Sequence, residues 1–218
     1  MTAAPRRESR IFPALAVLAL PVILSLLPGR YQLLPRGVPI SVGFLLAITL
    51  VTVGFAPANG LLTRIERYVA AVVLTFVTVV ELIVLAQLLH DMASAHPGVS
   101  GLTLLTTSIS IWTTNILVFA LTYWLLDRDG PTGRSAGWRG SADFSFPRGE
   151  PSDGVPADWQ PIFADYLALA FNTSAAFSPT DVLPLRPRAK MLMMLQSIIS
   201  LVTVIAVGAR AINILGSQ

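Results

Sequence analysis

Hydrophobic residues gather into five long runs that are separated by short polar segments. The runs cover residues 11–28, 37–57, 68–89, 101–126 and 191–215. A helix needs about 20 apolar residues to cross about 30 Å of hydrocarbon, and every run is near or above that length. Because lipid offers no hydrogen bonds to the backbone, the pattern predicts an all-α, polytopic transmembrane helical bundle with five spans.

A shorter apolar segment precedes the last run. Residues 159–171 have apolar positions at helical spacing, with Asp158 as a helix cap and Pro161 in the first turn. A helix of this length measures about 20 Å, which is too short to cross. Small polar residues follow it. We expect a re-entrant helix, because a crossing would place the cations of residues 186–190 on the other side of the membrane from most of the chain's arginines.

These elements divide the chain into three regions. Residues 1–126 form a four-helix transmembrane region, and residues 159–218 hold the re-entrant helix, a polar turn and the final span. Between them, residues 127–158 are rich in Gly, Pro and Ser, which predicts a solvated linker with little regular structure. The first run lacks a small-residue cleavage pattern, so we expect it to be retained as a span.

Composition and charge narrow the class of protein. Only 12% of the 218 residues are charged and 54% are apolar, which is unlike a soluble enzyme or a nucleic-acid-binding protein. The net charge of +3 comes from cations placed mainly in loops. Nine arginines before residue 150 fall on the side of the N-terminus, and two, Arg30 and Arg36, fall on the other side. The positive-inside rule therefore predicts a cytoplasmic N-terminus, with the lipid bilayer as the partner and no nucleic acid.

Glu81 and Arg210 are the ionisable residues within the predicted spans. An ionised carboxylate near the bilayer centre is costly unless it is paired or hydrated. Two interpretations are open: a functional charge with Arg210 as its partner, or a protonated Glu81 that hydrogen-bonds to Asn115 or Thr113 on a neighbouring helix. Hydroxyl residues share one face of the run 101–126, where we favour close helix packing over an aqueous path.

The remaining chemistry is sparse. Aromatic residues near the predicted helix ends are expected to be interfacial anchors, namely Tyr68, Tyr123, Trp124 and Trp159. The sequence has no cysteine, no nucleophile elbow, no zinc-protease motif and no phosphate-binding loop. We therefore expect no enzyme activity, no cofactor and no metal site.

Asp-Tyr at residues 165–166 and Asp-Val-Leu-Pro at residues 181–184 carry a resemblance. Together with the intervening residues, they resemble the pore helix, filter and post-filter segment of potassium-channel pore units. The filter positions 176–180 read Ala-Phe-Ser-Pro-Thr, with no glycine. Proline fixes the backbone where a potassium filter needs a ring of aligned carbonyls. The resemblance thus implies an ion-channel-like pore that lacks a potassium-selective filter.

By this analogy the chain is a homo-oligomer, a tetramer, and its path carries an inorganic ion. The candidate lining residues are Thr173, Ser174, Ser178, Thr180 and Asp181. Two alternatives stay open. One is a non-conducting membrane scaffold or subunit, and the other is a small secondary transporter that uses Glu81.

A second set of motifs covers more of the chain. Asp-Phe-x-Phe-Pro at residues 143–147 is followed by Asp-Trp at 158–159, Asp-Tyr at 165–166 and a Phe-to-Asp element at 171–181. From about residue 65 onward the chain is similar to a family of uncharacterised bacterial multi-pass membrane proteins, a domain of unknown function. This resemblance implies a bacterial plasma membrane and brings no activity with it.

Overall fold

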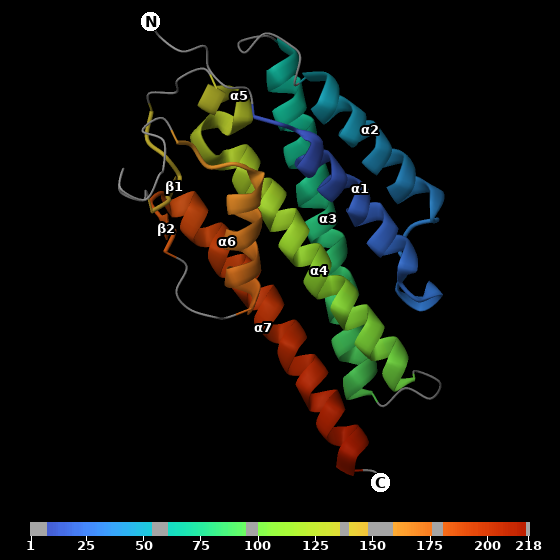
Figure 1. Ribbon diagram of the computed structural model, residues 1–218. Helices are drawn as coiled ribbons and strands as arrows, with labels where there is room; N and C mark the ends of the chain where they lie inside the picture. Colours follow the sequence, from blue (N-terminus) through green and yellow to red (C-terminus); the bar gives the residue numbers. More distant parts are fainter. Residues whose placement is uncertain are drawn as a thin grey trace, which may run out of the picture.

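The computed structural model describes residues 8–53, 61–94, 100–135, 140–147, 159–175 and 181–216. Nearly all of this part of the chain is helical, which confirms the all-α bundle (Figure 1). The α-helices are α1 (Ile11–Leu26), α2 (Gly37–Val53), α3 (Leu61–Ala93), α4 (Gly101–Leu126), α5 (Gly130–Ser135), α6 (Phe163–Ala175) and α7 (Pro187–Gly216). The short elements are the 3-10 turns η1 (Gly29–Tyr31) and η2 (Asp127–Asp129) and the strands β1 (Phe144–Ser145) and β2 (Leu183–Pro184).

Three helices, α3, α4 and α7, are long and apolar enough to cross a membrane, so the chain is an integral membrane protein. α1 and α2 are apolar but have only 16 and 17 residues, about 24 and 26 Å of helix. The described helices therefore include fewer full-length spans than the five expected. In α1 the helix stops before Pro28, and a residue that precedes proline disfavours the helical conformation.

Two ion pairs tie the chain around α1 to α3 at both ends. Arg10 pairs with Glu66. Arg30 donates two hydrogen bonds of 2.6 Å to the carboxylate of Asp91, and the Tyr31 hydroxyl donates another at 2.8 Å. Residues 66 and 91 are separated by 25 positions of α3, about 38 Å along the helix. The two ends of the segment from Arg10 to Tyr31 are thus tied to points on α3 that are farther apart than the hydrocarbon core is thick.

α4 is the central helix, because it packs against α1, α3, α6 and α7. In Figure 1 the α1–α2 hairpin lies on one side of α4, and α6 and α7 lie on the other. Tyr123 and Trp124 on α4 are 0% exposed, so these two rings are part of the core and the expectation of interfacial anchors was wrong for them. Tyr68 is 76% exposed, in keeping with that expectation.

The segment predicted as a solvated linker is partly folded. α4 ends in a tight reversal in which Arg128, Asp129 and Gly130 have φ angles of 52°, 58° and 75°. This left-handed turn stops the helix and leads into α5. Further on, Asp143 and Phe144 are 0% exposed. Residues 127–135 are helical, contrary to the prediction of little regular structure, whereas residues 140–147 contain only the two-residue strand β1 and are partly buried.

The chain enters α6 from the end of the bundle where α4 leads into α5 and returns to the same end after it. β1 precedes it and β2 follows it, and the two strands pair antiparallel, with Phe144 opposite Pro184 and Ser145 opposite Leu183. Between them, α6 packs against α4 and α7 (Figure 1). A short helix is therefore present where the re-entrant helix was predicted. It covers residues 163–175 instead of 159–171.

Candidate functional site around the re-entrant helix

Two carboxylates hold the N-terminal end of α6. Asp165 Oδ2 accepts a hydrogen bond of 2.8 Å from the Ile162 N–H, and Glu8 Oε1 accepts one of 2.9 Å from the Phe163 N–H. The first N–H groups of a helix lack partners within it, and the helix dipole favours negative charge there. These contacts explain why the helix starts four residues later than predicted. Asp158, the expected cap, lies outside the described residues.

A cluster of charged and polar side chains, most of them buried, joins this end of α6 to the rest of the bundle. We call it the polar cap and define it as Glu8, Asp127, Arg134, Asp143, Tyr166 and Arg188. Asp127 is 0% exposed. Its Oδ2 accepts a hydrogen bond of 2.7 Å from the Tyr166 hydroxyl, and its Oδ1 accepts one of 2.8 Å from the Asp143 N–H. A single carboxylate thereby connects α6 to the chain that leads into β1.

Arg134 on α5 is the buried cation of the polar cap, with 2% of its side chain exposed. Its guanidinium donates hydrogen bonds to the carbonyls of Trp124 at 2.9 Å and Asp127 at 3.0 Å, and to Glu8 Oε2 at 2.9 Å. The group also lies 5.1 Å from the centre of the Tyr166 ring. A buried guanidinium needs such partners, since an unpaired charge in the interior is costly.

Asp143 and Arg188 complete the polar cap and fix the start of α7. Arg188 donates two hydrogen bonds, of 2.6 and 2.7 Å, to the Asp143 carboxylate. The nearby Phe146 ring packs edge-on against Tyr166 at 5.1 Å between centres. The Asp-Phe-x-Phe-Pro and Asp-Tyr motifs, which are far apart in the sequence, thus meet in one cluster.

The C-terminal end of α6 is held by Gln196, a residue of α7 that is 0% exposed. Its amide donates to the Ala170 carbonyl at 2.7 Å and to Ser174 Oγ at 2.8 Å. In turn, its oxygen accepts a hydrogen bond of 2.6 Å from the Tyr123 hydroxyl. The Ser174 carbonyl accepts hydrogen bonds from the Ser200 hydroxyl and the Trp112 indole N–H. Side chains of α4 and α7 therefore satisfy the carbonyls at this end of α6.

The five candidate lining residues are placed differently. Ser174 is 3% exposed and its hydroxyl bonds to Gln196, so it supports α6 from within the bundle. Thr173 is half-buried and donates to the Leu169 carbonyl of its own helix at 2.8 Å. Asp181 is exposed beside β2. Ser178 and Thr180 lie outside the described residues. Thr173 and Asp181 are therefore the candidates whose described side chains have some exposure.

Glu81 is buried in α3, with 2% of the residue exposed. Neither of its carboxyl oxygens has a hydrogen-bond partner within the described part of the chain, so the bond to Asn115 or Thr113, one of the two open interpretations, is not formed. The backbone of Arg210 lies in α7, and its side chain is outside the described residues. Thr114 Oγ1 and Asn115 Oδ1 also lack partners. Buried oxygens without a hydrogen-bond partner are uncommon in proteins, so these side chains are candidates for a functional role.

Glu81 and Asn115 lie at a similar depth. Arg67 on α3 pairs with Asp129, just beyond α4, at 3.1 Å. Position 81 is 14 residues from Arg67, and position 115 is 14 residues from Asp129. Residues 67–81 span about 21 Å of α3, and α4 spans about 17 Å from its last residue, Leu126, back to residue 115, so the two side chains lie at a similar depth.

The comparisons with known proteins leave this site to be interpreted from its own geometry. No protein-family model matches the chain, and no curated protein or solved structure matches it either.

Proposed function

We propose that this protein is a subunit of an oligomeric membrane pore, in which α6 and the turn after it border a path for an inorganic cation. The observation that carries the proposal is the position of α6. This helix of 13 residues packs between α4 and α7, and the chain returns to the end from which α6 began. Irregular backbone at membrane depth is tolerated where protein covers it or where it lines water.

The charge distribution favours a cation. The C-terminal end of a helix carries a partial negative charge, and in α6 this end lies inside the bundle beside Gln196. Asp181 adds a full negative charge after the turn. The filter positions contain no glycine, so we propose a cation path without a potassium-selective ring of carbonyls.

One copy of the chain offers too little surface to enclose a path, so the proposal includes a homo-oligomer, a tetramer by analogy with channel pore units. We place it in a bacterial plasma membrane with a cytoplasmic N-terminus. The arginines support this orientation, because Arg10, Arg67, Arg134 and Arg188 all belong to the end of the bundle that holds the polar cap.

Cation flux into liposomes tests the pore. Purified protein reconstituted with a fluorescent cation indicator inside the vesicles is expected to admit cations, and Asp181→Asn is expected to reduce the initial rate. The matched control is Asp165→Asn, which removes the same charge at the other end of α6 while the amide oxygen still accepts from Ile162. Flux that is absent, or that Asp165→Asn and Asp181→Asn reduce equally, contradicts the proposal.

Glu81 supports a second candidate, a small secondary transporter coupled to protons or cations. A carboxyl group that is buried in a span, without a hydrogen-bond partner among the described residues, is the residue type that such carriers use. We expect Glu81→Gln to abolish uptake driven by a pH gradient. It should leave the passive cation flux along the path beside Asp181 unchanged. Loss of flux in both assays with an intact fold, or in neither assay, would count against this candidate.

A further inference from the structure

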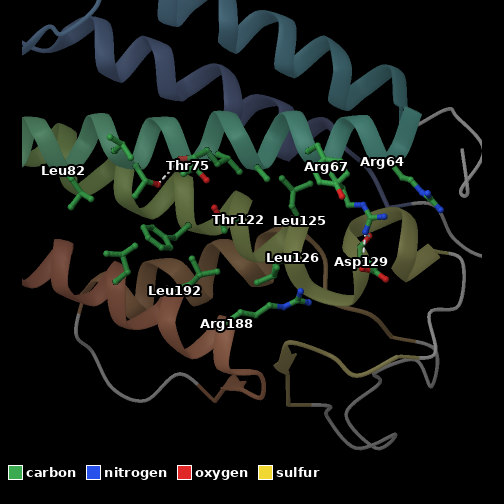
Figure 2. Close-up of a pocket in the computed structure, with 17 residues that line it drawn as sticks. Arg64, Arg67, Thr75, Leu82, Thr122, Leu125, Leu126, Asp129, Arg188 and Leu192 are labelled. Atoms are coloured by element: carbon green, nitrogen blue, oxygen red, sulfur yellow. Dashed lines mark hydrogen bonds and ion pairs between the residues drawn. The ribbon is translucent and has the colours of Figure 1, made fainter. Parts of the chain in front are cut away.

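A groove of about 780 Å³ runs between α3 and α7, with α4 as its floor. The three helices contribute a mainly apolar lining in which Leu74 and Phe119 are almost fully buried and form the base. Figure 2 shows Arg64, Arg67 and Asp129 at one end of the groove, and Leu82 at the other. Arg64, Arg67 and Asp129 thus lie at one end of a mainly apolar groove, and Arg188 extends from α7 toward the same end.

The rim of the groove is open. Tyr68, Val79 and Leu82, which line it, are 76%, 47% and 39% exposed. α3 and α7 are membrane-spanning by length and composition, so their exposed apolar side chains face the bilayer. A groove with this exposure in a membrane is filled by something apolar and elongated, since a void would forfeit packing contacts.

The charged end carries more positive than negative groups. Arg67 and Asp129 form an ion pair of 3.1 Å in which both side chains are largely exposed. Arg188 of α7 also lines the groove, and its guanidinium forms an ion pair with Asp143, which lies outside the groove. Arg64 is exposed, and within the described part of the chain no hydrogen bond or ion pair engages its side chain. Among the described residues, the groove therefore offers the guanidinium of Arg64 without a partner, next to an ion pair whose arginine can also bind a stronger anion.

We propose that the groove binds one anionic phospholipid. The phosphate lies between Arg64 and Arg67, where guanidinium groups can bind it with two parallel hydrogen bonds. An acyl chain lies along the apolar wall from Leu126 toward Leu82. Charge at one end and an apolar surface along the rest match an amphiphile, and basic pockets between spans at a membrane surface bind acidic headgroups. This inference does not rest on the pore.

Thermal unfolding in detergent with added lipid tests the site. We expect phosphatidylglycerol to raise the Tm, and phosphatidylcholine with identical chains to have a much smaller effect. Arg64→Gln should weaken the apparent affinity for phosphatidylglycerol about fivefold, with little change in the Tm of the lipid-free protein because Arg64 is exposed. The matched control is Arg36→Gln, which removes an exposed arginine at the other end of the molecule and should leave the affinity unchanged.

Other outcomes overturn the proposal. Equal effects of the two lipids, or equal losses in Arg64→Gln and Arg36→Gln, would show that charge at the groove does not select the ligand. A Tm rise of the same size with inorganic phosphate would mean a free-anion site. A disulfide between Val79→Cys in one copy and Leu192→Cys in another would mean that a second chain covers the groove.

Discussion

The guanidinium of Arg134 donates a hydrogen bond of 2.9 Å to the carboxylate of Glu8, 126 positions earlier in the chain. The same carboxylate accepts from the Trp124 indole at 2.7 Å and from the first turn of α6. One glutamate before α1 therefore connects α4, α5 and α6. The end of the bundle that carries the re-entrant helix depends on the residues that precede the first helix.

Loss of the Arg134 side chain should be strongly destabilising. Arg134→Met removes the cation that pairs with the Glu8 carboxylate, and it removes one donor from each of two carbonyls, so we expect the free energy of unfolding to fall by about 3 kcal/mol. Reversible unfolding in mixed detergent micelles measures this. The control is Arg67→Met, whose ion pair is 40% and 60% exposed and should contribute less than about 1 kcal/mol. Equal losses would show that burial does not distinguish the two pairs.

Gln196 should determine whether α6 stays docked. Gln196→Leu removes the donor for the Ala170 carbonyl and the acceptor for the Tyr123 hydroxyl, which should weaken docking by about 2 kcal/mol. A cysteine introduced by Ala170→Cys, at a position that is 0% exposed, should then react faster with a thiol reagent. Gln87→Leu on α3 is the control, because the Gln87 oxygen has no partner among the described residues. No increase in reactivity, or the same increase with Gln87→Leu, would contradict this role.

The contact between Tyr31 and Asp91 should make the protein sensitive to alkali. Burial, and then the hydrogen bond to Asp91, raise the pKa of Tyr31 from 10.0 to about 12. Because the folded protein holds this proton more tightly, its stabilising effect is complete below pH 10 and is lost as the pH rises through 12. The free energy of unfolding should therefore decrease between these pH values, and Tyr31→Phe should reduce the slope. An identical slope in the variant would exclude this contact as the cause.

Orientation can be tested with single cysteines, because the native chain has none. A cytoplasmic N-terminus predicts that a membrane-impermeant maleimide labels Arg36→Cys in intact cells. It also predicts that Gly140→Cys, in the exposed part of the chain before β1, is labelled only after the membrane is opened. The reverse result would place the re-entrant helix at the external surface, as in conventional channels.

Sequence patterns predicted the helices well, but they did not predict the side-chain contacts that hold α6 in place. Long apolar runs identify α3, α4 and α7 because lipid and core both require apolar residues, and the short length of α6 with its polar end predicts re-entry. The polar cap was missed because Glu8, Arg134 and Asp143 look like ordinary loop charges. Arg134 and Glu8 pair across 126 positions and Asp143 and Arg188 across 45, and local spacing carries no signal for such contacts. Ser174 was likewise assigned to the pore lining from a motif, whereas its hydroxyl accepts a hydrogen bond from Gln196 of α7.

The pairing of β1 with β2 has a consequence for the order of membrane insertion. Several of the groups that hold α6 and its flanks in place are synthesised after it, namely Gln196, Ser200, Arg188 and β2. A helix of 13 residues with a polar end is a weak insertion signal by itself. We therefore expect α6 to dock between α4 and α7 only after α7 has been inserted, which would make it the last helix to reach its final position.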